Sequence, residues 1–425
     1  MMAVWSNIST SALVGALRLD AEFWQPKYLD KEKAICAGEH MSLGALVSTF
    51  RKGIFYILAK EYADHGISFY RSSNVGDILP IEENLAFITN DKNTAEAKTS
   101  LTVGDLMIVK TGKSGASVVF DESCNVSQDV IAVKAKREKV DPFYLAVFLN
   151  TKYGKSEMDR WFQGQVQPHL SLDDARKIWV SMLPEPEQAA VAQLVVLSWK
   201  SRNAAKASYA EAQQLLESEL GLDKLHFDKL VGYTAQFSEL KSSHRIDAQH
   251  YQLRFAHLLN HLAKFPTTRI RDVRRHNRRG IQPIYVADGS HAVVNSQHLG
   301  PKHIDYDNLQ RTTEQAFDAA PAAHIEPEDL LIYTTGAYIG RTNVYLDDAP
   351  AFASNHVNIL RLSPDIDHAY MGVVFQSIIG QLQTQKHARG SAQAELYPSD
   401  IDKFVVPLLK PAKQEEIGNL VRDSL

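Results

Sequence analysis

The sequence is poor in cysteine and in long apolar segments. Only Cys36 and Cys124 occur among 425 residues, which excludes a disulfide framework or a cysteine-based metal cluster and is typical of a reducing cytoplasm. No apolar run approaches the roughly 18 residues that a membrane span needs. The stretch from Met1 to Leu19 lacks the basic and apolar regions of a signal peptide. We therefore expect a cytoplasmic protein without a membrane partner.

An excess of positive charge is also missing. Asp and Glu (50) outnumber Lys and Arg (46), and the net charge of −4 argues against a nucleic-acid-binding protein that is basic over its whole surface. Basic residues are concentrated locally instead. Seven lie between Lys264 and Arg279, with Asp272 as the only acid. This run is either a nucleic-acid contact or an ordinary solvated loop.

The motifs of the relevant enzymes are absent. No Pro-Pro pair occurs, so the chain lacks the Asn/Asp-Pro-Pro-aromatic loop that an adenine methyltransferase needs. Gly112-Lys113-Ser114 resembles the end of a phosphate loop, but Met107 stands where the first glycine is required, which favours a simple turn. Glu96-Ala97-Lys98 has a nuclease-like form and is interpreted as a polar loop. No histidine has the spacing of a zinc site. We expect no catalytic and no metal-binding residue.

The sequence repeats itself once. Residues 18–21 recur at 245–248, and residues 104–112 recur in similar form at 328–336. Residues 141–188 align without a gap with 367–414, and twelve of these 48 positions are identical, whereas chance gives about three. A period of this length indicates a duplicated domain and not a solenoid.

Each copy has the pattern of a mixed α and β domain. Leu106–Val109 and Leu330–Tyr333 are short apolar runs before a glycine, which is typical of buried strands. Asp141 and Asp367 are placed as N-caps of amphipathic helices. The segments Ile178–Val180 and Phe404–Val406 predict a further strand near the end of each copy.

A long helix is predicted between the copies. Pro186–Leu220 contains no internal glycine or proline, and Gly221 is a plausible stop, so a continuous helix would be about 52 Å long. Leu194, Ala205 and Ala212 fall near a 3.5-residue seam that serines interrupt. Small residues there would allow a partner helix to approach closely.

Both copies close with a related signature. In the first copy it reads Gly164-Gln165-Val166-Gln167-Pro168-His169-Leu170-Ser171, followed by Ile178–Val180, Leu183-Pro184 and Glu187-Gln188. The second copy has Gly390, Gln393, Leu396, Val405–Leu408 and Gln414. With the duplication and the long helix, this order resembles the specificity subunits of type I restriction–modification systems over nearly the whole chain.

That resemblance implies an α+β fold with two tandem target-recognition domains separated by a coiled-coil-type helix. The segments would be an N-terminal arm (1–18), the first recognition domain (19–183), the central helix (184–226), the second recognition domain (227–410) and the start of a second helix (411–425). In the family a second long helix follows the second domain, whereas only 14 residues follow Pro411 here, so this helix would be short.

The resemblance also implies a non-catalytic, DNA-binding function. Each domain would read one half of a bipartite double-stranded DNA target, and the helices would fix the gap between the halves. Two modification subunits would methylate one adenine in each half, and a restriction subunit would add translocation and cleavage. S-adenosylmethionine, ATP and Mg²⁺ would belong to those partners and not to this chain. The alternative is a scaffold or adaptor that uses the same duplicated domain without binding DNA.

The candidate DNA contacts are cations and amides, because Arg or Lys pairs with guanine and Asn or Gln with adenine. In the first copy they are Arg51, Lys52, Arg71, Lys110, Lys113, Gln165 and Gln167. In the second copy they are Arg274, Arg275, Arg278, Arg341, Lys386 and Arg389. The polar positions differ between the copies, so we expect an asymmetric target. We expect partners to dock on the helical segments and the loops beside the matching Gln188 and Gln414, as a pseudo-symmetric surface requires.

Overall fold

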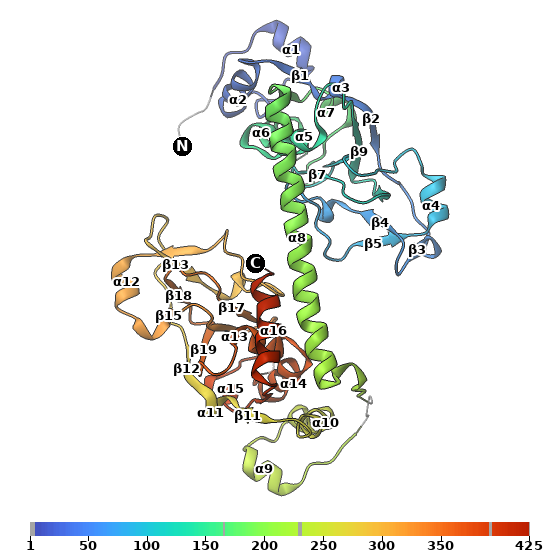
Figure 1. The fold of residues 1–425 in the computed structure, drawn as a ribbon. Coiled ribbons are helices and arrows are strands. Elements are labelled where there is room, and N and C mark those ends of the chain that lie inside the picture. Colours follow the sequence, from blue (N-terminus) through green and yellow to red (C-terminus); the bar gives the residue numbers. More distant parts are fainter. Residues whose placement is uncertain (1–4, 165, 228–231, 391–392, 425) are drawn as a thin grey trace. The chain divides into compact units, whose positions relative to one another are not determined.

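The computed structural model describes residues 5–164, 166–227, 232–390 and 393–424, and the chain forms two compact units (Figure 1). Unit 1 is Met1–Ser201 and unit 2 is Arg202–Leu425. Each unit combines helices with small β-sheets, and the long helix α8 (Glu185–Leu220) begins in unit 1 and ends in unit 2. The predicted α+β class with a long helix is confirmed, and the finer segment boundaries stay a prediction.

Unit 1 is built from short elements. Its helices are α1 (Thr10–Ala16), α2 (Pro26–Cys36), α3 (Leu43–Leu46), η1 (Ala59–Glu61), η2 (Ser72–Asn74), α4 (Asn90–Ala95), α5 (Pro142–Asn150), α6 (Lys152–Trp161) and α7 (Leu172–Ala175). Its strands are β1 (His40–Ser42), β2 (Val47–Lys52), β3 (Tyr62–Ala63), β4 (Ile67–Tyr70), β5 (Ala86–Ile88), β6 (Leu106–Val109), β7 (Ala116–Val118), β8 (Cys124–Val126), β9 (Val130–Ala135) and β10 (Trp179–Ser181). They form an antiparallel sheet of order β2-β9-β6-β7, a mixed sheet of order β3-β5-β4-β8 and the pair β1-β10.

Unit 2 repeats this plan. Its helices are η3 (Leu222–Lys224), α9 (Phe237–Ser243), η4 (Ala248–Tyr251), α10 (Leu253–Leu262), α11 (Ile270–Val273), η5 (Ser296–His298), α12 (Glu314–Asp318), η6 (Pro321–Ala323), α13 (His368–Gln376), α14 (Ile378–His387), α15 (Pro398–Ile401) and α16 (Pro411–Arg422). Its strands are β11 (Thr267–Arg269), β12 (Arg274–Arg279), β13 (His291–Val294), β14 (Gln310–Thr312), β15 (His324–Ile325), β16 (Leu330–Tyr333), β17 (Thr342–Val344), β18 (Ala351–Ala353), β19 (Val357–Leu362) and β20 (Val405–Pro407).

The larger sheets of the two units are equivalent. Unit 2 has an antiparallel sheet of order β12-β19-β16-β17, a mixed sheet of order β14-β13-β18-β15 and the pair β11-β20. Arg51 lies opposite Ala132 in unit 1, and Arg278 lies opposite Ile359 in unit 2, so both pairs keep the shift of 227 residues. Each edge strand also has an irregularity at the same place, between Val47 and Thr49 and between Arg274 and His276. The internal repeat is therefore a repeat of strand order and register.

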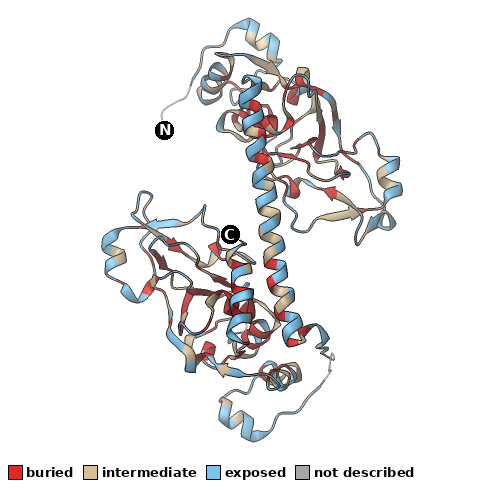
Figure 2. Ribbon diagram, viewed as in Figure 1, coloured by how far each residue is buried: buried red, intermediate tan, exposed pale blue. Residues whose placement is uncertain are grey.

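The apolar runs form the cores that their sequence predicts. All four residues of β6 are buried, as are the first three of β16, and Figure 2 shows buried segments on the strands and on the helices beside them. Asp141 caps α5 by accepting the N–H groups of Phe143 and Tyr144, and Asp367 caps α13 through the N–H of Tyr370. The predicted closing strands are present as β10 and β20, each starting one residue later.

Gln188 and Gln414 have an internal role in each unit. The side-chain oxygen of Gln188 accepts the N–H of Asp141 at 2.9 Å, and its amide nitrogen donates to the carbonyl of Leu183 at 2.7 Å. Gln414 makes the same two bonds to Asp367 and Leu409, at 3.2 and 2.8 Å. Both glutamines are buried. The match of these two positions therefore has a reason internal to each unit, and docking of partners on the helical segments and the loops beside them stays a prediction.

Helix α8 begins one residue earlier than predicted and ends at Leu220, and Gly221 takes the left-handed conformation with φ +59°. Val195 is buried in the core of unit 1, whereas Tyr209 and Ala212 are buried in the core of unit 2. The predicted seam is not continuous, because Leu194 is 67% exposed although it shares a helix face with Ala212. The two ends of the helix instead pack into different cores.

Candidate nucleic-acid interface

Three segments of unit 1 meet at one end of the larger sheet, where β9 pairs with β2 on one side and with β6 on the other. Lys52, the last residue of β2, pairs with Ile131, which also pairs with Ile108 of β6. The turn after β6 is bonded to the segment after α6, since the N–H of Gly112 donates to the carbonyl of Pro168 at 3.0 Å and the N–H of Leu170 donates to Lys110 at 2.8 Å. We call this set, Arg51–Lys52, Lys110–Lys113 and the described part of 163–169, the unit 1 rim.

A cationic cluster lies in the unit 1 rim. The ammonium of Lys110 is 3.4 Å from Nδ1 of His169. Burial lowers the pKa of Lys110, and the nearby charge of Lys52 lowers it further. Burial also lowers the pKa of His169, with Lys110 and Lys52 adding to the effect. The lowered pKa favours the neutral imidazole at pH 7, and its Nδ1 lies within reach of the Lys110 ammonium and, at 3.2 Å, of the Thr111 hydroxyl.

The other predicted residues of this rim reach solvent. Arg51, Lys52, Lys113 and Gln167 are exposed, whereas Lys110 is only 8% exposed. Gln165 lies outside the described residues. The glycine before Lys113 has φ +115°, which confirms a turn at Gly112. Exposed cations on a fixed frame can bind phosphates, and Lys110 lies beneath them beside His169 and stays a predicted contact.

Unit 2 has a rim at the equivalent place. The N–H of Gly336 donates to the carbonyl of Ala394 at 3.0 Å, and the N–H of Leu396 donates to Thr334 at 2.9 Å. We define the unit 2 rim as Arg278–Arg279, the turn 334–338 and the described part of 389–395. Gly336 repeats the positive φ of its unit 1 equivalent, at +110°. The main-chain frame of the two rims is thus the same.

The side chains on that frame are different. Thr334 takes the place of Lys110 and is fully buried, with its hydroxyl donating to the carbonyl of His356. Glu395 takes the place of His169 and lies 3.9 Å from Arg279, which is the equivalent of Lys52. A rim with an ammonium and an imidazole donor in unit 1 therefore corresponds to a rim with a carboxylate acceptor and a guanidinium in unit 2.

The structure separates the arginine run of β12. Arg278 and Arg279 are at the rim end of the strand, whereas Arg274 and Arg275 are at its start, about 13 Å away at 3.3 Å per residue. Arg274 is paired with Asp402, and Arg275 lines a different, polar cavity together with Glu326. The run is therefore not one continuous basic surface, and the contact of its arginines with DNA stays a prediction.

Other predicted contacts also lie apart from the rims or are engaged. Arg71 precedes η2 and donates to the carbonyl of Asn84 at 2.6 Å. Arg341 closes the turn after β16, with its guanidinium 4.2 Å from the ring centre of Tyr338 and a bond to the carbonyl of Leu299. Lys386 is half-buried beside a cavity that Glu239 also lines, and burial lowers its pKa.

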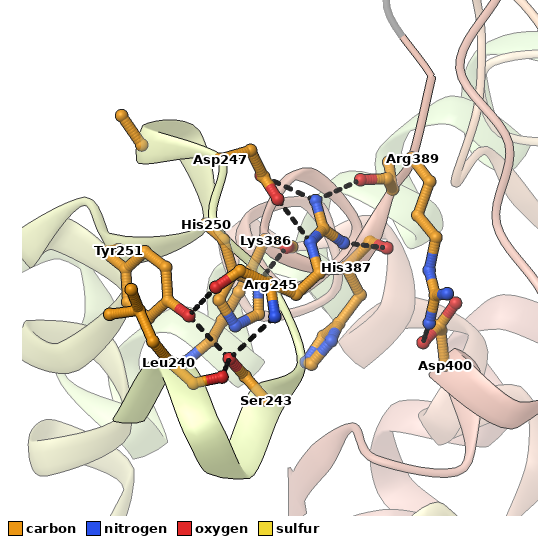
Figure 3. A network of polar contacts seen from close by, with 12 residues as sticks. Leu240, Ser243, Arg245, Asp247, His250, Tyr251, Lys386, His387, Arg389 and Asp400 are labelled. Atoms are coloured by element: carbon orange, nitrogen blue, oxygen red, sulfur yellow. Dashed lines mark hydrogen bonds and ion pairs between the residues drawn. The ribbon is translucent and has the colours of Figure 1, made fainter. Parts of the chain in front are cut away.

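Arg389 belongs to a polar network that supports the unit 2 rim (Figure 3). It donates to Asp400 at 2.8 Å. The carbonyls of His387 and Ala388, the two residues before Arg389, accept hydrogen bonds from Arg245. The guanidinium of Arg245 in turn donates to Asp247 at 2.6 and 2.7 Å. The repeated Arg-x-Asp motif therefore ties the segment before α10 to the loop that carries Arg389.

Sequence reasoning missed Arg279 as a rim residue. Its guanidinium donates to the carbonyl of Leu396 at 2.9 Å and lies 4.8 Å from the ring centre of Tyr397. The signal was available, because Arg279 stands 227 residues after Lys52, at the shift that relates the two copies. Within the part of the chain that the structure describes, no three His, Cys, Asp or Glu side chains gather as metal ligands would.

None of the helices within the described ranges is both long and apolar enough to cross a membrane. No family model and no curated protein matches the chain. Among solved structures, the chain is similar to the type I restriction–modification S subunit from M. genitalium, with 11% identity and a TM-score of 0.48 over 90% of this chain and 88% of that one.

The chain is also similar to the HsdS subunit from Thermoanaerobacter tengcongensis, with 13% identity and a TM-score of 0.30 over 91% of this chain and 88% of the other. A structure of the assembly of a type I restriction–modification system gives 14% identity and a TM-score of 0.32 over 90% and 89% of the two chains. The resemblance to type I specificity subunits seen in the sequence is thus found again among solved structures. These three TM-scores are below 0.5, so the proposed function rests on this chain's own residues.

Proposed function

We propose that this chain is the DNA-specificity subunit of a type I restriction–modification complex. Each unit reads one half of an asymmetric, bipartite double-stranded target, and partner subunits carry out adenine methylation and restriction. The observation that supports this most strongly is the pair of rims, which share one main-chain frame and differ in side chains. Shared strands and turns preserve a fold, whereas different donors and acceptors at the same place select different ligands.

The chemistry of each rim fits a base edge. Lys52 is an exposed donor, the exposed imidazole of His169 donates through Nε2 when its Nδ1 accepts from Lys110, and guanine presents two acceptors in the major groove. Glu395 is an acceptor for the amino group of cytosine, and Arg279 beside it is a donor. Exposed Arg51 and Arg278, at equivalent places on the two edge strands, are positioned for phosphates. Each good bidentate pair discriminates by about 1–3 kcal/mol.

The partners supply the reactions. Two modification subunits bind S-adenosylmethionine and methylate one adenine per half-site, and a restriction subunit uses ATP and Mg²⁺. This chain carries no catalytic residue in the proposal, in keeping with the missing Pro-Pro loop and phosphate loop. The second candidate is an adaptor that does not bind DNA, which the net charge of −4 and the ion-paired arginines favour.

The experiment that separates the two is DNA binding by the chain with its modification subunit at several salt concentrations. A specificity subunit binds more weakly as salt rises, because phosphate contacts release counterions. Substituting Arg51→Ala should reduce the slope of log K against log salt by about 0.9. Methylation sequencing of cells that express the complex then gives the target. Binding that is absent at low salt, with no methylated site in cells, would support the adaptor instead.

A further inference from the structure

Two aromatic side chains project from unit 1 immediately after its basic strand. Phe55 is 74% exposed and Tyr56 is 67% exposed, and they follow Arg51 and Lys52 by only a few residues. The Lys52 ammonium lies 4.8 Å from the ring centre of Phe55. Adjacent large apolar side chains in water are unfavourable, and clusters of this kind mark surfaces that bind something.

The backbone beneath these side chains is fixed. The N–H of Gly53 donates to the carbonyl of Val130 at 3.0 Å, and the N–H of Ile54 donates to that of Val126 at 2.8 Å. A Cβ on Gly53 would lie 2.3 Å from two main-chain oxygens, so only glycine fits there. Ile54 is buried against Phe69. Phe55 and Tyr56 are therefore held outward by an anchored segment.

Unit 2 has a related arrangement, although Gln282 and Pro283 stand at the positions equivalent to Phe55 and Tyr56, and Ile281 is 45% exposed whereas Ile54 is buried. A Cβ on Gly280 would lie 1.9 Å from the carbonyl oxygen of Ala353, so only glycine fits there as well. Ile281 forms a β-bridge with Ser354. The chain then presents Ile284, 66% exposed, and Tyr285, 43% exposed. Both units thus have an apolar tip after a basic strand and an anchoring glycine, although the residue types differ.

We propose that these tips are wedges that insert between neighbouring base pairs of the bound DNA, one in each half-site. This rests on the proposed function and adds a mode of reading to it. Phosphate binding by the exposed cations of each strand brings the duplex against the tip, and residues 53–58 of the unit 1 tip contain no carboxylate. The segment 280–285 contains none, and Glu61 in unit 1 is engaged by the N–H of Leu58 at 2.6 Å.

An apolar wedge reads DNA through its deformability. Inserted Phe, Leu or Ile side chains unstack and kink a base step, and pyrimidine–purine steps yield most easily. Each half-site should therefore contain one such step next to the bases that the rim contacts. Phe55 has no hydrogen-bonding group, so this preference is independent of the donors and acceptors in the rim.

The test uses the full chain with its modification subunits and duplexes that carry the methylated target. 2-Aminopurine replaces single adenines other than the two that are methylated, because a methyltransferase flips its target base out of the stack. We expect the complex to increase the fluorescence at one step in each half-site. Phe55→Ala should abolish the increase in one half, Ile284→Ala in the other, and each should weaken binding about tenfold without changing the salt slope. Phe55→Leu should retain most of the signal, and Phe237→Ala, an exposed phenylalanine of α9, should change nothing.

The outcomes are distinct. Absence of DNA binding by the unsubstituted complex would reject the proposed function and the wedge together. DNA binding without any fluorescence increase, and with Phe55→Ala within twofold of the unsubstituted complex, would reject the wedge alone. Loss of the modification subunit from the Phe55→Ala complex would show a protein-docking surface and would likewise overturn the proposal. Unfolding curves that coincide with that of the unsubstituted chain confirm that each variant is folded.

Discussion

Glu157 is a buried carboxyl group of unit 1 that shares its nearest cation with a second acid. It lies on α6, is 1% exposed, and accepts the N–H of Trp179 at 3.4 Å. Arg160 is 3.7 Å away, but this guanidinium is closer to Glu32, at 2.8 Å. Burial raises the pKa of Glu157 to about 7, against the attraction of Arg160. A proton is therefore bound more tightly in the folded protein than in the unfolded chain.

This shift predicts that unit 1 loses stability as the pH rises. Between pH 4.5 and 7 the folded state holds a proton that the unfolded state has released, so the free energy of unfolding falls through this window and then levels off. Glu157→Gln, which imitates the protonated acid, should remove this dependence and stabilise the protein by about 3 kcal/mol at pH 8. Urea unfolding of both proteins at pH 5, 6, 7 and 8 measures the free energy of unfolding and its pH dependence.

The matched control is Glu138→Gln, since Glu138 is exposed in the same unit. Its unfolding curves should follow those of the unsubstituted protein at every pH. An equal pH dependence in the Glu157→Gln variant would show that other groups cause it.

Gln188 gives a second prediction at this scale. Its two amide atoms satisfy the N–H of Asp141 and the carbonyl of Leu183, and Leu would leave both without a partner. We expect Gln188→Leu to destabilise the protein by about 2–3 kcal/mol, since each unsatisfied buried group costs about 1–3 kcal/mol. Urea unfolding curves of the variant and the unsubstituted protein measure this loss of stability. Gln193→Leu, an exposed glutamine on the same helix, should cost less than about 0.5 kcal/mol.

Local signals predicted individual residues well where the partner is close in sequence. Asp141 and Asp367 cap the helices that begin at the next residue, and Gly112 makes the turn after its strand. The surroundings of Lys110 could not be predicted in this way, because His169 comes from a loop 59 residues later. Only the folded arrangement shows that this lysine is buried.

At the scale of elements, the pattern of apolar residues predicted the long segments and missed the short strands. The sequence predicted β6 and β16 and the helix α8, because long apolar or unbroken stretches leave few alternatives. The sheet β3-β5-β4-β8 was not predicted, since its strands have only two to four residues and exposed as well as buried positions. Strands this short are defined by their neighbours and not by their own sequence.

Helix α8 supports a prediction about spacing. Its buried residues lie near its ends, and no residue from Ser201 to Ser208 is buried. Four residues inserted after Ala204 add about 6 Å and about one turn. If α8 sets the gap between the half-sites, the methylated adenines should move apart by one or two base pairs, at about 3.4 Å each. Methylation sequencing of cells with the altered subunit measures the gap.

The control for this change is the same insertion after Asp348, in an exposed loop of unit 2. It should leave the gap and the target unchanged. A methylated site with its original gap after the α8 insertion would reject the helix as a spacer.

For the whole molecule, the duplication is the most informative property of the sequence. It predicted two equivalent domains, and strand order, register and glycine conformations agree between the larger sheets. It could not show which polar residues gather at the rims, because the insertions that place them differ between the copies. Arg279 and Glu395 are brought together by main-chain bonds between the turn after β16 and the loop before α15.

The last prediction is that the two units read DNA independently, so replacing 19–183 with a second copy of 246–409 should give a symmetric target. Both junctions preserve shared geometry. Arg18 would pair with the incoming Asp247 as Arg245 does, and Gln188 would meet Asp367 and Leu409 as Gln414 does. The hybrid should therefore fold and present two rims of the Arg279 and Glu395 type.

Sequencing of methylated DNA should then show one original half-site twice, in inverted orientation. The reciprocal hybrid, with 19–183 in place of 246–409, is the matched control and should duplicate the other half. Each result is expected because the side chains that contact bases belong to the transferred unit, whereas the main-chain frame is the same in both units. If the first hybrid folds, binds its partners and still methylates the original asymmetric site, the rims do not select the bases and the proposed mode of reading is wrong.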